Sequence, residues 1–219
     1  MTTDYARWRR YVLDSIIEPT VSRDVLSLGR IDRTRPAAAA LLPRLRVLRS
    51  DCHVHEARGP APGRGNTTTL AGNLGRLADA WLVVGLQKYS GKALRKRGSP
   101  PRLLVLSTAL QSAVKGLTFE EARADTEHWG RLVETAVGAR LAAATAAAGA
   151  GRLYYWRQGD IEVDYVVVRG AALSAIEVKS GRWPKDDAAG MAAFARLYRP
   201  QEATLVGSGG VPLEVVLSR

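Results

Sequence analysis

The sequence has little cysteine, few aromatic residues and no long apolar run. Its 219 residues include a single cysteine, Cys52, so no disulfide can form within the chain, which fits a reducing cytoplasm. No stretch approaches the roughly 18 apolar residues of a membrane span, and the N-terminal Met-Thr-Thr-Asp lacks the basic start and apolar core of a signal peptide. These absences predict a cytoplasmic protein with no membrane partner.

A nucleotide-binding loop is also absent. No G-x-x-x-x-G-K-[ST] motif occurs in the chain, so we expect no ATP site of the P-loop kind. Positive charge, in contrast, is plentiful: 32 Lys and Arg face 21 Asp and Glu, which gives a net charge of +11. This excess favours a polyanionic partner such as DNA, although Arg-rich chains from GC-rich genomes are often basic for compositional reasons.

The first half of the chain divides into three segments. Residues 1–32 are expected to form N-terminal helices that Pro19 breaks or restarts. One apolar stripe at helical spacing supports this expectation, formed by Trp8, Tyr11, Val12, Ile16 and Ile17. Residues 33–65 carry several prolines, few acidic residues and no sustained period, which predicts an irregular segment.

The third segment, residues 66–112, has the outline of a winged helix. We expect a helix over 66–79, followed by strands at 81–86 and 102–106 that flank a basic loop. In this interpretation the loop is a wing that contacts DNA phosphates. The DNA-binding candidates are Lys88, Lys92, Arg95, Lys96, Arg97 and Arg102. The alternative is a small structural element with a solvated basic loop.

The second half, residues 117–219, predicts a mixed α/β domain. A long helix is expected over 117–150, with Glu134 beside its apolar stripe. Three strands follow and are joined by tight turns, one of them at Arg169-Gly170. A helix over 186–197 and a last strand over 202–208 complete the pattern.

Two carboxylates and a lysine interrupt the apolar strands of this domain. Strand periodicity puts Glu177 and Lys179 on one face, and an antiparallel neighbour can bring Asp164 alongside them. Such charges in an apolar sheet are costly unless they bind something, most simply a divalent metal and a phosphate. Mg²⁺ or Mn²⁺ would take the two carboxylates and the Val178 carbonyl as ligands, while Lys179 orients or deprotonates the attacking water. The catalytic set we expect is Glu134, Asp164, Glu177 and Lys179; the alternative is a pair of surface carboxylates salt-bridged to Lys179.

The order of these residues, with Glu177-Val178-Lys179 thirteen residues after Asp164, resembles the PD-(D/E)xK nuclease superfamily. The resemblance implies a restriction-endonuclease-like mixed α/β domain. With the helices and the winged-helix outline that precede it, we expect an α+β or α/β chain whose helical and winged-helix-like N-terminal half is followed by that domain. The resemblance also implies Mg²⁺-dependent hydrolysis of DNA phosphodiesters. Because nuclease-like folds also serve without cleavage, a non-catalytic DNA- or protein-binding module is the alternative.

Five sequence blocks extend the resemblance. They are similar to the C-terminal region of prokaryotic AAA-type ATPases, a region catalogued as domain of unknown function 4143. The blocks are YVLDSIIEPTVSRDVLSL, NTTTLAGNLGRLADAWLVVGLQKY, HWGRLVETAVGARL, YYWRQGDIEVDYVV and AIEVKSGRW. Because the P-loop domain of that family is missing here, the resemblance implies either an ATPase domain that acts in trans or a truncated remnant of such a system.

The chain also departs from that family. Asn73 stands where tyrosine is usual, and the strand at 103–107 lacks the usual aspartate. Residues 37–65 do not resemble the family and look like GC-rich coding sequence read in a shifted frame. We hypothesise a compensated frameshift there. The idea fails if neither alternative reading frame of the gene encodes an amphipathic helix.

Overall fold

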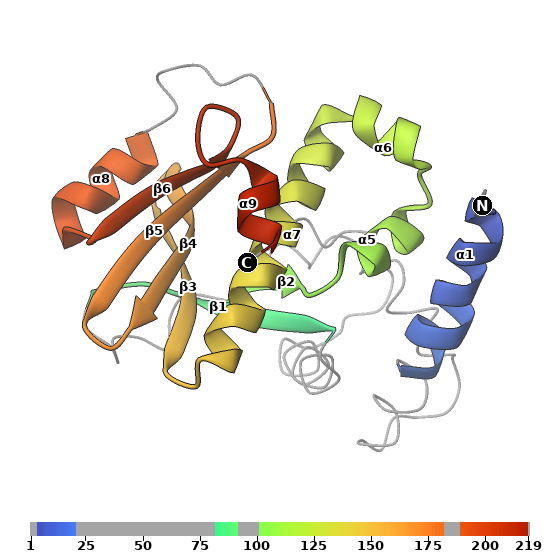
Figure 1. Ribbon diagram of the computed structural model, residues 1–219, viewed down its shortest axis with the longest axis horizontal. Coiled ribbons are helices and arrows are strands. Elements are labelled where there is room, and N and C mark those ends of the chain that lie inside the picture. The colour runs from blue at the N-terminus through green and yellow to red at the C-terminus, as the bar shows by residue number, and fades with distance from the viewer. Residues whose placement is uncertain (1–3, 21–81, 92–100, 182–188, 219) are drawn as a thin grey trace.

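The computed structural model describes residues 4–20, 82–91, 101–181 and 189–218 (Figure 1). The predictions for residues 33–65 and for the helix at 66–79 lie outside the described residues, as do most of those for the basic loop. Within the described part the chain is α+β, with helices around a six-stranded mixed sheet.

The sheet has the strand order β2-β1-β3-β4-β5-β6. The β1–β3 and β5–β6 pairs are parallel, and the other three pairs are antiparallel. The predicted meander, its turn at Gly170 and the final strand are confirmed. The strands are β1 (Val83–Lys88), β2 (Arg102–Val105), β3 (Gly151–Gln158), β4 (Ile161–Arg169), β5 (Ala172–Lys179) and β6 (Glu202–Gly207).

The β1–β2 hairpin belongs to the same sheet as the later strands. The sequence analysis placed this hairpin in a winged-helix segment separate from the α/β domain. In the structure, Gln87 and Lys88 of β1 pair with Tyr154 and Tyr155 of β3. The hairpin therefore extends the edge of the main sheet, and β2 comes close to the long helix that covers it.

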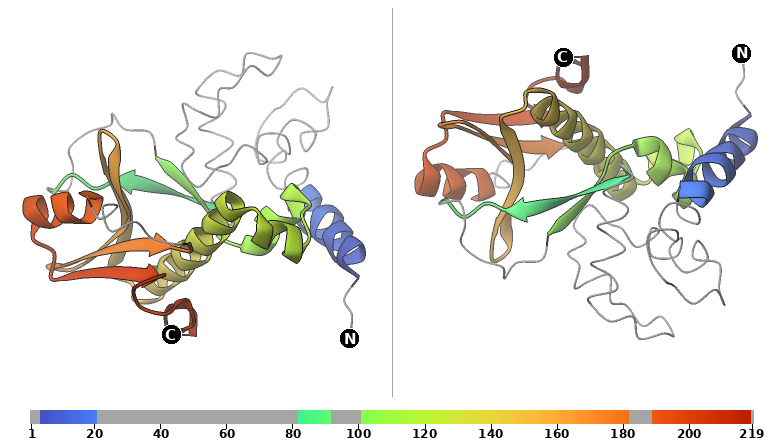
Figure 2. Two further views of the ribbon diagram at one scale, coloured as in Figure 1. Left: turned by 90° about the horizontal axis from the view of Figure 1, so that it is seen from above. Right: turned by 90° about the horizontal axis from the view of Figure 1, so that it is seen from below.

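Helices pack on both faces of the sheet (Figure 2). One face meets α7 (Thr126–Ala147) and the short α9 (Leu213–Ser218), and the opposite face meets α8 (Ala189–Tyr198). Alternate residues of β5 divide between two cores: Ile176 packs with α7, and Ala175 packs with Phe194 of α8. None of the helices described here combines the length and apolar character that a bilayer crossing requires.

The N-terminal helix packs at the far end of the molecule from α8 (Figure 1). It begins as α1 (Tyr5–Tyr11) and continues as the π-helix η1 (Val12–Ile17), which packs on α5 (Thr108–Lys115). The predicted stripe is wrong at two positions, because Tyr11 and Ile16 are exposed while Val12 and Ile17 are buried. The wider π turn explains this change, since it brings residues five apart onto one face. Pro19 does not end the helical run, which continues to Thr20.

The long helix expected over 117–150 is two helices. The first is α6 (Phe119–Ala124), and Asp125 separates it from α7. The extended backbone of Asp125 ends α6, and its carboxylate accepts a hydrogen bond of 3.0 Å from the His128 N–H, which caps α7. The cap fixes where α7 starts and hence which of its residues reach the sheet.

Candidate functional site

The site forms where strands β4 and β5 separate. Their antiparallel pairing runs as far as Tyr165 and Ile176 and stops there. At the next position the Asp164 side chain replaces the backbone ladder, because its Oδ2 accepts a hydrogen bond of 2.8 Å from the Val178 N–H. The predicted meeting of Asp164 with the Glu177-Val178-Lys179 segment is confirmed, and a side-chain contact holds it.

A β-bulge in β4 directs Asp164 toward this opening. Trp156 of β3 pairs with Val163, and Tyr154 pairs with Val166, so β4 contains one extra residue between the two pairs. Val163 and Val166 both pack on the α8 side of the sheet, which regular alternation would forbid for residues three apart. Asp164 and its neighbour, both buried, lie inside the bulge and face α7.

That neighbour, Tyr165, fixes the register of α7 on the sheet. Its hydroxyl donates a hydrogen bond of 2.9 Å to the Glu134 carbonyl oxygen. A Cβ added at Gly138 would lie 2.3 Å from the same hydroxyl, so the helix can approach this closely because residue 138 is glycine. Burial, followed by the nearby charge of Glu134, raises the pKa of Tyr165 well above its ordinary value, so the hydroxyl remains a donor. The Glu134 side chain is thereby held over the site.

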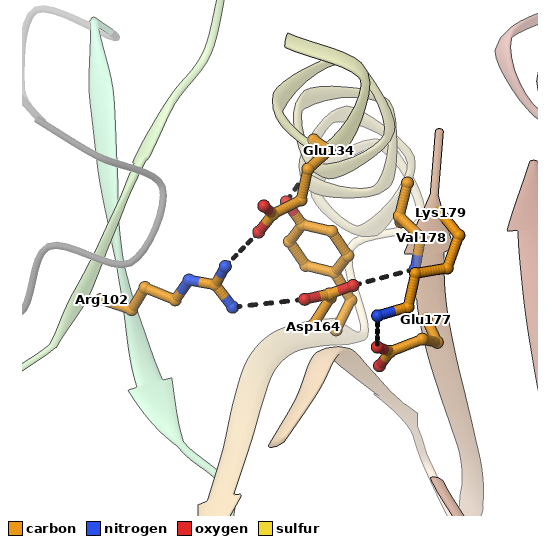
Figure 3. Close-up of polar contacts among 7 residues, drawn as sticks. Arg102, Glu134, Asp164, Glu177, Val178 and Lys179 are labelled. Carbon is orange, nitrogen blue, oxygen red and sulfur yellow. Dashed lines mark hydrogen bonds and ion pairs between the residues drawn. The ribbon is translucent and has the colours of Figure 1, made fainter. Parts of the chain in front are cut away.

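Arg102, the first residue of β2, lies between two of the predicted site carboxylates (Figure 3). Its Nη2 donates to Glu134 Oε1, and its Nη1 lies 3.8 Å from Asp164 Oδ1. The residue is 3% exposed. Burial alone would lower the pKa of Arg102, but Glu134 and Asp164 outweigh burial and raise it above its ordinary value. The sequence analysis placed Arg102 on an exposed wing; the structure corrects this, because its guanidinium is buried against two carboxylates.

Glu177 and Lys179 form the other side of the site. Lys179 Nζ lies 3.1 Å from Glu177 Oε1, as the strand periodicity predicted. The second oxygen, Glu177 Oε2, is buried and has no hydrogen-bond partner among the described residues. Burial and the neighbouring Asp164 raise the pKa of Glu177 to about 8, against the opposing effect of Lys179. Burial likewise raises the pKa of Asp164, although Arg102 and the Val178 N–H counteract it.

A cavity of about 500 Å³ opens over these groups. Its walls come from the start of α7, the β4 bulge, the end of β5 and the first residues of α8. All four predicted catalytic residues line it, and so does Val178. Arg131, one turn before Glu134 on α7, lines it too and pairs with Glu127. The site is therefore a hollow with carboxylates at its base and two basic side chains, Lys179 and Arg131, in its wall.

The donor set fits one divalent cation. In the described part of the chain no three His, Cys, Asp or Glu side chains gather as a metal-binding group. Mg²⁺, however, is usually bound by one or two carboxylates together with water and phosphate oxygens. Asp164 and Glu177 are two adjacent carboxylates, and the buried Oε2 of Glu177 is an acceptor that a cation would satisfy.

The predicted DNA-binding residues lie in different environments. Lys88 is exposed at the end of β1, whereas Arg102 is buried in the site. The remaining four, Lys92, Arg95, Lys96 and Arg97, lie outside the described residues.

Two residues of the site, Tyr165 and Arg131, were not predicted from the sequence. Tyr165 reads in the sequence as one more apolar strand residue, and only the bulge shows that it supports Glu134. Arg131 carries a usable signal, since it precedes Glu134 by three residues and so shares its helix face.

The comparisons with known proteins give one match. Residues 129–215 match the model of the domain of unknown function DUF4143, which here runs from α7 into α9. No curated protein and no solved structure matches the chain. The matched region contains Glu134, Asp164, Glu177 and Lys179, while Arg102 lies before it. The site thus combines the matched domain with a residue from the preceding hairpin.

Proposed function

We propose that the chain binds one divalent cation, Mg²⁺ or Mn²⁺, at Asp164 and Glu177 and hydrolyses phosphodiester bonds in DNA. The observation that carries this proposal is the buried Oε2 of Glu177, which has no described hydrogen-bond partner and belongs to a residue that lines the cavity together with the carboxylate of Asp164. A buried carboxylate oxygen without a donor is costly, and a cation in the cavity removes that cost.

The ligands would be the carboxylates of Asp164 and Glu177 and the carbonyl oxygen of Val178. The bulge and the 2.8 Å bond from the Val178 N–H hold Asp164 in place before any ligand arrives. When bound, the cation would lower the pKa of an attacking water and stabilise the negative charge that develops on the phosphate.

Lys179 and Arg131 would act on the substrate phosphate. Lys179 is 27% exposed in its side chain and reaches the cavity, so its ammonium can approach a non-bridging phosphate oxygen while it stays close to Glu177. Arg131 lies in the same wall, where it can bind a neighbouring phosphate. In the reaction the water oxygen forms the new bond to phosphorus and gives up a proton to solvent, the bond to one deoxyribose oxygen breaks, and that oxygen takes a proton from solvent.

The charge of the whole chain supports DNA as the substrate. A net charge of +11 attracts a polyanion, and Lys88 is one of the contributing cations that the structure shows to be exposed. The winged-helix and restriction-endonuclease-like interpretations of the fold, the cytoplasmic location and an ATPase domain acting in trans belong to the same proposal. They rest on the sequence resemblance.

A second candidate is a non-catalytic module that binds DNA or a partner ATPase. One observation favours it: Arg102 engages Glu134, a member of the expected catalytic set. Binding that falls steeply with salt, without cleavage, would support this candidate, because phosphate contacts release counterions.

A nuclease assay on labelled duplex and junction DNA with Mg²⁺ or Mn²⁺ tests the proposal. Asp164→Asn and Glu177→Gln should each lower the cleavage rate about 100-fold or more, since a bound cation contributes several kcal/mol to such a transition state. Asp160→Asn is the matched control, because Asp160 is an exposed carboxylate at the rim of the same cavity and should leave the rate unchanged. Cleavage that survives Asp164→Asn would refute the proposed site.

A further inference from the structure

Arg102 occupies a position that a metal ion could take. Its guanidinium contacts Glu134 through Nη2 and approaches Asp164 Oδ1 to 3.8 Å through Nη1, so one cation bridges two carboxylates from α7 and β4 (Figure 3). We propose that Arg102 stands in place of a second metal ion, so that this site binds a single divalent cation, on its Glu177 side. This inference rests on the cation site of the proposed function and specifies how many divalent cations that site binds.

The contacts of the four carboxylate oxygens of Asp164 and Glu177 support the binding of a single cation. Asp164 Oδ2 accepts from the Val178 N–H and Oδ1 faces Arg102, while Glu177 Oε1 faces Lys179. Of these four oxygens, Glu177 Oε2 is the one that has neither a hydrogen bond nor an ion-pair contact among the described residues. The open coordination position is therefore at Glu177, away from the guanidinium.

The charges of the site lead to the same stoichiometry. Among the residues joined by these contacts, the carboxylates of Glu134, Asp164 and Glu177 outnumber the cations of Arg102 and Lys179 by one, which leaves a single negative charge when all are ionised. One dication reverses the charge of this group, and a bound phosphodiester then neutralises it. A second dication would have to lie close to the Arg102 guanidinium, and charges of like sign repel strongly in such a buried position.

The 3% exposure of Arg102 makes it a permanent part of the site. A surface lysine or arginine could move aside for an arriving metal ion. Arg102 is anchored at the start of β2, which pairs with β1 over four residues, and its guanidinium is held by two carboxylates. Because Arg102 comes from the hairpin, removing the hairpin would also change how the matched domain binds metal.

The test is a Mn²⁺ titration of the full chain, followed by electron paramagnetic resonance and calorimetry. We expect the wild type to bind one Mn²⁺ per chain and to show no spin coupling between neighbouring ions. Arg102→Ala should bind two, with spin coupling, because it opens the position between Glu134 and Asp164. Arg102→Lys keeps a cation there and should remain at one. Methylguanidinium added to Arg102→Ala should displace the second ion.

Each outcome decides the inference. Two ions or none in the wild type would overturn it, and so would a single ion in a folded Arg102→Ala variant. If the alanine variant fails to fold, Arg102→Gln replaces it, because the amide can still donate to Glu134 while the charge is lost. If neither variant folds, the wild-type count alone decides. If the wild type binds one Mn²⁺ but does not cleave DNA, the proposed hydrolysis is refuted and this inference is upheld. If it cleaves DNA and binds two Mn²⁺, hydrolysis is upheld and this inference is refuted.

Discussion

The charged groups on the two sides of the site differ in their burial and in their partners. On the hairpin side, Arg102 contacts carboxylates from α7 and β4, and every member of that group is buried or nearly so. On the β5 side, Lys179 is partly exposed and contacts Glu177 Oε1, and the other oxygen, Oε2, is buried without a described hydrogen-bond partner.

This difference distinguishes charged groups that stabilise the fold from charged groups that are available to bind a ligand. A buried charge is tolerated when it is paired and hydrogen-bonded, and on the hairpin side Arg102 donates a hydrogen bond to Glu134 and pairs with Asp164 at 3.8 Å. On the β5 side Glu177 Oε2 has no described hydrogen-bond partner, and burial, followed by the charge of Asp164, raises the pKa of Glu177 to about 8. We therefore expect substitutions on the hairpin side to reduce stability, and those on the β5 side to change ligand binding.

The largest effect should come from Arg102→Met. This change leaves Glu134 and Asp164 buried without their cation, and breaking such a pair from one side typically costs about 3–5 kcal/mol. Urea unfolding without metal would measure the loss in the free energy of unfolding.

The matched control for Arg102 is Arg131→Met. Arg131 also pairs with a glutamate at the cavity, but that partner, Glu127, is 67% exposed in its side chain. Its loss should cost less than about 1 kcal/mol. Equal losses for the two variants would show that burial does not distinguish the two ion pairs.

The next effect is a loss of stability with rising pH. The pKa of Glu177 is about 8 in the folded chain and 4.5 ordinarily. Between these values the folded state keeps a proton that the unfolded state has lost, so stability is full below pH 4.5 and falls as pH rises through about 8. The melting temperature without metal, measured from pH 5 to 9, should fall across this window.

Glu177→Gln isolates the contribution of that carboxyl to the pH dependence. The pKa of Asp164 is also raised and acts in the same direction, so some dependence should remain in the variant. Saturating Mn²⁺ should likewise flatten the wild-type curve at high pH, since a ligand of the folded state stabilises it. An unchanged slope in Glu177→Gln would contradict the assignment.

A smaller effect is expected for Tyr165→Phe. The hydroxyl hydrogen bond to the Glu134 carbonyl is lost, which should cost about 1 kcal/mol in the free energy of unfolding. Since Phe keeps the ring and Glu134 is not one of the proposed metal ligands, Mn²⁺ affinity should stay within about twofold of wild type. A large change in affinity would instead show that the register of α7 sets the site.

The strands that build the site were predictable because their signal is local. Apolar alternation and the turn at Gly170 define β4 and β5, and an antiparallel pair of that spacing must bring Asp164 near Val178. The joining of β1 to β3 has no such signal, because it pairs residues far apart in the chain. The break at Asp125 was missed because its capping role competes with a continuous apolar stripe.

Arg102 shows the limit of sequence reasoning about the site. The stretch at 88–97 before it is basic and contains no acidic residue, so local composition assigns Arg102 to the same solvated loop. Its burial depends instead on β2 lying beside α7, a tertiary contact that no short window of sequence reveals. The bulge at Asp164 is similar, because it becomes visible only once the register with β3 is known.

The smallest effect on stability is expected for Lys179→Met. At pH 7 the Glu177 carboxyl is mostly protonated, because its pKa is about 8, so little is lost when its cation is removed. The Lys179 ammonium is also partly exposed, and such ion pairs contribute less than about 1 kcal/mol. The cost should grow at pH 9, where Glu177 is charged. Cleavage of DNA, in contrast, should be lost at both pH values. A stability loss at pH 7 as large as that of Arg102→Met would mean that both sides of the site serve the fold.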